Sequence, residues 1–186
     1  MMMKNIEDFA EKKIREHEYF QNSFMRVTND EVVLPDDAMS HRVVVHHPGG
    51  VNLIALDELG RLLLVEQYRY PVGRITFETP AGKREPGEAN EVTAKRELEE
   101  ETGYTCGRLE SLGELAVSPG YTTEMIENFL VHDLTKLDYD VPGDADEFIN
   151  LHAVTREQAL AMFEKGQICD YKTIYAIQYL MLHQGW

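Results

Sequence analysis

Four glutamates lie close together near the end of a predicted helix. Glu100 and Glu101 follow Glu97 by three and four residues, which places the three carboxylates on one helical face. Glu99 lies on another face. Each like-charge pair at this spacing costs about 0.2–0.5 kcal/mol in an exposed helix, and the C-terminal end of a helix favours cations instead. Stacked carboxylates are also the hard oxygen ligands that Mg²⁺ binds. The cluster therefore predicts a site for a divalent cation, and the alternative is an acidic face that only contacts solvent.

A longer pattern surrounds this cluster. Gly82 is followed after five residues by Glu88, and after seven more by Arg96-Glu97-Leu98-Glu99-Glu100-Glu101-Thr102-Gly103-Tyr104. This arrangement resembles the Nudix box, G-x5-E-x7-R-E-U-x-E-E-x-G-U, where U is a bulky aliphatic residue. All the fixed residues of the box are present, and the one departure is Tyr104 in place of an aliphatic residue. The resemblance implies the Nudix fold, an αβα sandwich with a mixed sheet, and hydrolysis of a nucleoside diphosphate linked to another group.

The resemblance also implies roles for the residues of the box. Mg²⁺, or Mn²⁺ in its place, would be held by four groups, the carbonyl of Ala81 and the carboxylates of Glu97, Glu100 and Glu101. Arg96 would pair with the glutamates and orient them, so the expected catalytic residues of the box are Arg96, Glu97 and Glu100. Glu88 would support the geometry of the loop and helix or hold an outer metal ion.

The residue that activates the attacking water is expected outside the box. In the enzymes that this chain resembles, an acid on a loop commonly has this role, and Asp144-Ala145-Asp146-Glu147 lies on the loop predicted before a strand over 148–154. We expect Glu147 to be the general base, followed by Asp146 or Asp144. Two alternatives are that Glu100 of the box is the base, or that the loop acids only contact solvent.

Three further segments resemble ADP-ribose pyrophosphatases, a subfamily of the Nudix hydrolases. They are residues 66–72, residues 77–83, and Ser118-Pro119-Gly120-Tyr121, whose proline lies sixteen residues beyond Gly103. The resemblance implies hydrolysis of ADP-ribose to AMP and ribose 5-phosphate. The alternatives are a related enzyme acting on GDP-mannose or ADP-glucose, and a sensor that binds ADP-ribose without cleaving it. The sensor ranks lower because the chain keeps every glutamate of the box.

The same subfamily implies four residues that contact the substrate. Arg69 is expected near the phosphates, because a guanidinium matches phosphate geometry, and Glu78 is expected near the ribose. Phe24 would stack on the adenine, and Arg42 from a second subunit would cover the opposite face of the base. The alternative for Phe24 is a place in the core of a small sheet. These roles imply a domain-swapped homodimer whose N-terminal sheets cross between subunits.

The elements that must position these residues follow from the hydrophobic pattern and the turn residues. Apolar side chains at helical spacing predict a helix over 4–18, and short β-branched segments predict strands at 24–28, 31–34 and 42–47. The break at Pro48-Gly49-Gly50 predicts two domains. The first, residues 1–48, would serve dimerisation and the adenosine pocket, and the second, residues 49–186, would be the Nudix hydrolase domain.

Within the second domain, two apolar runs at 51–56 and 62–68 predict a hairpin. A helix is predicted over 88–102, ended by Gly103, and two more over 155–165 and 171–182, the first with a capping box at Thr155. Further strands are predicted at 75–79, 109–117, 126–132 and 148–154. This order favours an α/β (α+β) class with a mixed sheet, preceded by a small antiparallel sheet.

Composition excludes several other classes of protein. The chain of 186 residues is 43% hydrophobic, which is enough apolar material for a core, and its formal net charge is −15. Because so acidic a surface repels polyanions, we expect neither nucleic acid nor a membrane as a partner. The resemblance to ADP-ribose pyrophosphatases implies a small nucleotide sugar as the partner instead. No apolar run is long enough for a membrane span, and two cysteines suit a reducing compartment. These features favour a cytoplasmic enzyme.

Overall fold

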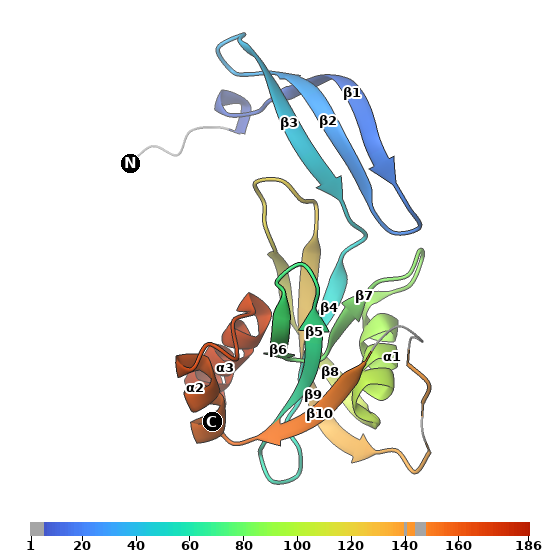
Figure 1. Ribbon diagram of the computed structural model, residues 1–186, viewed down its shortest axis with the longest axis vertical. Helices are drawn as coiled ribbons and strands as arrows, with labels where there is room; N and C mark the ends of the chain where they lie inside the picture. Colours follow the sequence, from blue (N-terminus) through green and yellow to red (C-terminus); the bar gives the residue numbers. More distant parts are fainter. Residues whose placement is uncertain (1–5, 140, 144–147) are drawn as a thin grey trace. The chain divides into compact units, whose positions relative to one another are not determined.

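The residues that the structure describes, 6–139, 141–143 and 148–186, form a mixed α+β fold with three sheets and three α-helices (Figure 1). The structure is a computed structural model of the chain. Its contacts divide the chain into two units. The first unit comprises Met1–Gly49 and Ala116–Met125, and the second comprises Gly50–Leu115 and Ile126–Trp186.

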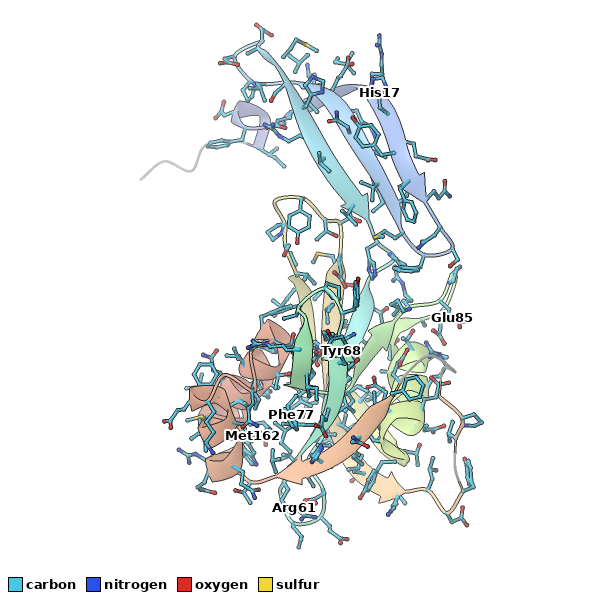
Figure 2. The ribbon with its side chains drawn as sticks, viewed as in Figure 1. His17, Arg61, Tyr68, Phe77, Glu85 and Met162 are labelled. Atoms are coloured by element: carbon cyan, nitrogen blue, oxygen red, sulfur yellow. The ribbon has the colours of Figure 1, made fainter. Side chains whose placement is uncertain are left out.

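The first unit is built on an antiparallel sheet with the strand order β1-β2-β3. Its elements are a 3-10 helix, η1 (Ile6–Asp8), and the strands β1 (Lys12–Gln21), β2 (Arg26–Val33) and β3 (Met39–His46). The helix predicted over 4–18 is wrong, because pairing with β2 along the whole of β1 overrides a weak helical spacing. His17 of β1, labelled in Figure 2, contacts Glu31 of β2 across this pair at 3.1 Å. The two strands predicted at 24–28 and 31–34 are one strand, since β2 continues through Asn29 and Asp30.

The segment Ala116–Met125 joins this unit although it is distant in sequence. The turn Ser118-Pro119-Gly120-Tyr121 lies within it and is attached to β3 through the backbone. The N–H of Val45 donates to the carbonyl of Tyr121 at 2.7 Å, and the N–H of Thr123 donates to the carbonyl of Val45 at 3.0 Å. The sequence pattern around Pro119 therefore has a structural role as a turn paired to the N-terminal sheet.

The second unit contains a four-stranded mixed sheet, β7-β4-β9-β8, and a three-stranded antiparallel sheet, β10-β5-β6. In the mixed sheet β4 is antiparallel to β7 and parallel to β9. The strands are β4 (Gly50–Ile54), β5 (Leu62–Arg69), β6 (Arg74–Glu78), β7 (Ala81–Lys83), β8 (Tyr104–Ala116), β9 (Met125–Lys136) and β10 (Ile149–Val154).

The two apolar runs predicted as a hairpin are both strands, but the hairpin is wrong because β4 and β5 belong to different sheets. They are joined by an isolated bridge between Leu56 and Leu62 and by a hydrogen bond from the N–H of Leu63 to the carbonyl of Ala55 at 3.0 Å. β4 has β7 and β9 as its neighbours, and β5 has β6 and β10. Both edges of each strand are therefore occupied, so neither has an edge available for a β4–β5 ladder.

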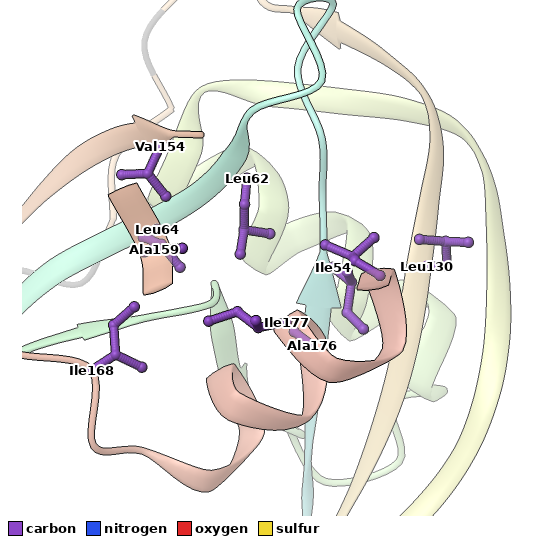
Figure 3. Close-up of a cluster of buried hydrophobic side chains, with 10 residues drawn as sticks. Ile54, Leu62, Leu64, Leu130, Val154, Ala159, Ile168, Ala176 and Ile177 are labelled. Carbon is purple, nitrogen blue, oxygen red and sulfur yellow. The ribbon is translucent and has the colours of Figure 1, made fainter. Parts of the chain in front are cut away.

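Helices pack on both sides of these strands. They are α1 (Asn90–Thr102), α2 (Arg156–Glu164) and α3 (Tyr171–His183). Ile54 and Leu64 lie in a buried cluster with residues of α2 and α3 (Figure 3), whereas Leu53 and Leu63 lie in a second cluster with residues of α1. Because neighbouring residues of a strand face opposite sides, each strand supplies both clusters. The result is the αβα arrangement that the sequence favours.

The helix ends follow the sequence signals. Gly103 ends α1 in the left-handed conformation, with φ of 68°, which glycine adopts at low cost. Thr155 and Gln158 form the predicted capping box of α2. Among the described residues, no helix has the length and apolar composition needed to cross a membrane.

Candidate functional site

Gly82 of β7 lies directly against the carboxylate of Glu97. A Cβ atom added at Gly82 would lie 1.8 Å from Cδ of Glu97 and 2.0 Å from its Oε1, far closer than real contacts allow. Glu97 is only 8% exposed, so its carboxylate is held between the β7 backbone and helix α1. Glycine at this position lets the carboxylate of Glu97 lie directly against the strand, and any side chain there would displace that carboxylate.

Ala81 directs its backbone toward a second carboxylate of the helix. Its N–H donates to Oε2 of Glu101 at 2.9 Å, and Glu101 is itself buried. The preceding carbonyl, that of Pro80, points the other way and accepts from the N–H of Leu53 in β4 at 2.8 Å. Because the N–H and C=O of one strand residue point to the same side, the carbonyl of Ala81 faces the side on which Glu101 lies.

Arg96 connects the acidic residues of the site. Its Nη1 donates to Glu97 at 2.8 Å and to Glu100 at 2.9 Å. Nε and Nη2 donate to Glu88 at 3.4 and 3.3 Å, and Nη2 also donates to the carbonyl of Lys83 at 3.2 Å. Burial alone would lower the pKa of Arg96, but Glu88, Glu97 and Glu100 together raise it well above its ordinary value. The chain thus supplies part of the positive charge that the stacked glutamates need.

Glu88 fixes the loop that precedes the helix. Its Oε2 accepts from Oγ1 of Thr93 at 2.8 Å and from the N–H of Glu85 at 3.3 Å. Burial alone would raise the pKa of Glu88, but hydrogen bonds from Arg96, Thr93 and the Glu85 backbone lower it. The N-cap residue Ala89 has no side chain that could cap α1, so the Glu88–Thr93 bond ties the first turn of the helix to the loop.

The donors around Gly82 suit a hard divalent cation. The carboxylates of Glu97, Glu100 and Glu101 and the carbonyl of Ala81 are oxygen donors of the kind that Mg²⁺ prefers. Within the described ranges, no three His, Cys, Asp or Glu side chains are grouped as a metal site. Nη1 of Arg96 lies between Glu97 and Glu100 here and bonds to both. The chemistry of the donors therefore fits the metal, while the structure shows two of the carboxylates oriented by Arg96.

The structure brings Arg69 and Glu78 together as a bidentate ion pair. Nε of Arg69 donates to Oε1 of Glu78 at 2.9 Å, and Nη2 donates to Oε2 at 2.8 Å. Glu78 is 3% exposed, whereas the side chain of Arg69 is 41% exposed. Glu78 has the largest effect in raising the pKa of Arg69, and the charge of Glu101 adds to it. Both carboxylates therefore favour the charged form of Arg69.

Phe24 and Arg42 belong to the first unit. Phe24 lies in the turn between β1 and β2, where Oδ1 of Asn22 accepts its N–H at 3.0 Å. Its ring is 42% exposed and meets the ring of His47 edge-on, with centroids 5.9 Å apart. Arg42 lies in the middle of β3 and donates to Glu11 at 2.6 Å. Within this chain the two residues thus occupy different parts of the small sheet.

Glu147, the expected general base, lies outside the described residues, as do Asp144 and Asp146. Gly143 of the same loop is described, and a Cβ atom added there would lie 4.0 Å from the carbonyl oxygen of Glu100. Gly143 therefore lies beside the last turns of α1. Glu100, the alternative base, accepts from Arg96 through Oε2 at 2.9 Å.

A buried polar network in the second unit has no counterpart in the sequence patterns. Oγ1 of Thr79 donates to Oδ1 of Asn52 at 2.6 Å, and Nδ2 of Asn52 donates to Oδ1 of Asn128 at 2.9 Å. Lys172 of α3 is also buried and donates to Oε2 of Glu78 at 2.5 Å. The one signal in the sequence is a polar residue, Asn52, inside the apolar run of β4.

Known proteins with similar sequences and structures were compared with the chain. A family model described as the NUDIX domain matches residues 46–176. Two relatives are 41% identical to the chain. An "ADP-ribose pyrophosphatase" from Bacillus subtilis matches over 183 residues, 98% of this chain and 97% of the relative, and a "Methanol dehydrogenase activator" from Bacillus methanolicus matches over 177 residues, 95% and 96%.

More distant similarities point to related proteins. A "GDP-mannose pyrophosphatase" from an Enterobacter species is 30% identical over 185 residues, which cover 94% of this chain and 95% of the relative. The solved structure titled "Crystal structure of ADP compounds hydrolase" superposes with a TM-score of 0.78 at 16% identity, and the match covers 92% of this chain and 94% of that one. At this identity the superposition shows a shared fold.

Proposed function

The chain belongs to the NUDIX hydrolase family, and from this premise we propose that it hydrolyses the pyrophosphate bond of ADP-ribose, releasing AMP and ribose 5-phosphate. The observation that carries the proposal is the packing of Glu97 and Glu101 against the backbone of residues 81–82, which gathers hard oxygen donors in one place. The choice of substrate is supported by 41% identity, over nearly the whole chain, to a relative named ADP-ribose pyrophosphatase.

In this proposal the box residues hold Mg²⁺, or Mn²⁺ in its place. The ligands are the carbonyl of Ala81 and the carboxylates of Glu97, Glu100 and Glu101. When bound, the metal supplies positive charge that neutralises the pyrophosphate and the departing phosphate. Arg96 holds Glu97 and Glu100 in one orientation by donating to both from a single nitrogen. Without a cation the acidic cluster would repel the pyrophosphate, so metal and substrate are expected to bind together.

Other residues act on the substrate itself. Arg69 binds a phosphate oxygen, and Glu78 orients Arg69 from behind. The oxygen of a water molecule forms a bond to one phosphorus, the bond from that phosphorus to the bridging oxygen breaks, and a carboxylate accepts the proton of the water. The proposed acceptor is Glu147, with Glu100 as the alternative.

We also propose a domain-swapped homodimer in which Phe24 and Arg42 complete the adenosine pocket. The β1-β2-β3 sheet supports this, because several of its large apolar side chains are more than half exposed: Ile14, Tyr19, Met39 and Val43. Two buried oxygens of the sheet, Oδ1 of Asn29 and Oδ1 of Asp30, have no hydrogen-bond partner among the described residues. Both oxygens are enclosed within the single chain, so the support for a dimer comes from the exposed apolar side chains.

Two other functions each have an observation in their favour. The 30% identity to a GDP-mannose pyrophosphatase favours a different nucleotide sugar as the substrate. The 41% identity to a methanol dehydrogenase activator favours an effect on a dehydrogenase. A pyrophosphatase acting on GDP-mannose would use the same acidic helix, so the box does not distinguish it from an enzyme that hydrolyses ADP-ribose.

A substrate panel separates these functions. The purified chain is incubated with Mg²⁺ and ADP-ribose, ADP-glucose or GDP-mannose, and the products are identified by chromatography. We expect the highest kcat/KM for ADP-ribose, with AMP and ribose 5-phosphate as products. A preference for GDP-mannose would replace the proposed substrate, and cleavage of none of the three would refute the enzyme proposal. A methanol dehydrogenase assay with and without the chain tests the second alternative.

A further inference from the structure

Four charged side chains that alternate in sign extend from the exposed end of Arg69 into the protein. Glu78 of β6 accepts both hydrogen bonds of Arg69, at 2.9 and 2.8 Å. Lys172 of α3 donates to Oε2 of Glu78 at 2.5 Å, and its Nζ lies 3.0 Å from Oδ2 of Asp170. Lys172 and Glu78, the two inner members of this row of four side chains, are 6% and 3% exposed, so both are buried.

Stability alone does not explain a buried lysine here. Removing two charges from water costs several kcal/mol per ion, and a buried ion pair is often no more stable than apolar side chains of similar volume. Asp170 does not need Lys172, because it already caps α3 by accepting from the N–H of Thr173 at 3.0 Å and from its Oγ1 at 2.7 Å. The lysine is therefore better explained by what it does to Glu78.

Lys172 completes the hydrogen bonding of Glu78. Oε1 of Glu78 accepts from Nε of Arg69 and from Oγ1 of Thr76 at 2.6 Å, while Oε2 accepts from Nη2 of Arg69 and from Lys172. With each oxygen bonded on two sides, the carboxylate is held in one orientation. It consequently presents a fixed pair of acceptors to the guanidinium of Arg69.

Lys172 also balances the charge of Glu78. A guanidinium paired with a carboxylate alone forms a neutral unit, which attracts an anion weakly. The positive charge of Lys172 offsets that of Glu78, and Asp170, the next acid along, lies at the N-terminus of α3, where the helix dipole offsets a negative charge. The positive charge of Arg69, whose side chain is 41% exposed, thus stays available to an anion.

We propose that Lys172 is a positioning residue for Arg69: it locks and neutralises Glu78, so that Arg69 keeps both its orientation and its charge for a phosphate of the substrate. This inference rests on the proposed function. Lys172 itself is buried behind Glu78, and its effect on the substrate passes through that carboxylate.

Kinetics of Lys172→Met in the full chain test the proposal. We expect KM for ADP-ribose to rise about tenfold or more, the scale of one charge-assisted hydrogen bond, while kcat changes little. The matched control is Ile177→Ala on the same helix, which removes buried apolar volume from the core cluster and no hydrogen bond of the four charged groups. The control should lose stability and keep its KM. Equal KM values for wild type and Lys172→Met would overturn the proposal.

A double mutant separates charge balance from a general loss of structure. In the Glu78→Gln background the charge of Glu78 is gone and no longer needs to be balanced, so adding Lys172→Met should have much less effect on KM than it has in the wild type. Additive effects would contradict the proposal. If Lys172→Met does not fold, Lys172→Gln keeps a donor near Glu78 without the charge and gives the same comparison.

A spectroscopic measurement keeps the inference independent of the substrate. The Nε–H signal of Arg69 is identified in a ¹H–¹⁵N spectrum by its loss in Arg69→Lys. We expect slow exchange with water in the wild type and in Ile177→Ala, and faster exchange in Lys172→Met. If no panel compound is cleaved, the proposed function fails while this signal still reports on the link between Lys172 and Arg69. An unchanged signal in Lys172→Met would overturn that link.

Discussion

At the scale of single residues, Gly82 links strand β7 to the acidic helix α1, because its backbone lies against the carboxylate of Glu97. A Cβ at this position would displace the carboxylate of Glu97, which already occupies that space. The glycine of the box thus permits a close approach of strand and carboxylate, and its role does not depend on an unusual backbone angle. The contact places Glu97 and, through Ala81, Glu101 on a defined backbone surface.

Removing the charge of one of these carboxylates should abolish metal-dependent hydrolysis. For Glu97→Gln or Glu101→Gln we expect kcat/KM to fall by more than the roughly 10–100-fold typical of residues that only support a ligand, with the fold retained. The matched control is Glu99→Gln, because Glu99 lies on the same helix and accepts from Oγ1 of Thr105 at 2.7 Å, away from Gly82. Hydrolysis rates measured over a range of Mg²⁺ concentrations decide the matter, and near-native rates in either variant would show that the metal assignment is wrong.

Adding one carbon at Gly82 should separate folding from activity. In Gly82→Ala the new Cβ displaces the end of a flexible side chain, so we expect the chain to fold while the carboxylate of Glu97 moves and activity falls at least about tenfold. Thermal unfolding and kinetics are measured on the same samples. Gly107→Ala is the control, since its Cβ would meet Asp133 at 3.0 Å, outside the box. Equal activity losses in the two variants would contradict this account.

At the scale of elements, helix α1 contains both an unfavourable cluster of negative charges and the arginine that partly offsets it. Stacked glutamates near a C-terminus oppose both one another and the helix dipole. Arg96 offsets part of this repulsion by donating hydrogen bonds to Glu97 and Glu100. It also donates to Glu88, which holds the loop before the helix. The sequence predicts that a cation is needed there, and the structure shows that an arginine of the same helix meets part of the need.

The junction of β5, β6 and α3 should make stability depend on acid pH. Burial alone would raise the pKa of Glu78, but Arg69 and Lys172 lower it far below its ordinary value of 4.5. A lowered pKa means that this contribution is fully present above about pH 4.5 and is lost as the pH falls toward the folded-state pKa, because the unfolded chain then binds the proton more readily.

We therefore expect the free energy of unfolding of Glu78→Gln to fall less steeply below about pH 4.5 than that of the wild type. The difference in slope should approach about 1.4 kcal/mol per pH unit, the limit for one proton. Urea unfolding at several pH values between neutral and acid measures both slopes. Parallel curves for the two proteins would show that Glu78 does not carry this dependence.

At the scale of the whole molecule, the N-terminal sheet has large apolar side chains that a single chain does not cover. Its strands expose the large apolar side chains of Ile14, Tyr19, Met39 and Val43. These features support the proposed homodimer, in which the sheet is covered by a second copy and the expected roles of Phe24 and Arg42 become available to the site.

A charge on this sheet should disrupt the dimer. Val43 of β3 is 53% exposed, so Val43→Asp should fold as a chain yet elute as a monomer with lower activity toward ADP-ribose. Leu59→Asp is the control, because Leu59 is exposed in the turn between β4 and β5 of the other unit. Light scattering after size-exclusion chromatography measures the mass. A wild-type chain that is monomeric at micromolar concentration would refute the dimer.

The sequence by itself determined the family, the αβα architecture, helix α1 with its end at Gly103, and the capping box of α2. The expected Nudix fold is confirmed. These features could be predicted because their residues lie close together along the chain, where spacing alone decides which side chains share a helical face or a turn. The residues of the box follow one another within a single loop and helix, so their pattern is complete in the sequence.

Only the tertiary structure decided which distant segments meet. Residues 12–21 form a strand because β2 pairs with them, and β4 separates from β5 because other strands occupy its edges. The contacts of Gly82 with Glu97 and of Lys172 with Glu78 join elements that spacing cannot relate. Pairing and close packing depend on partners brought together by folding, so hydrophobic and helical periodicity predict the elements but not these contacts.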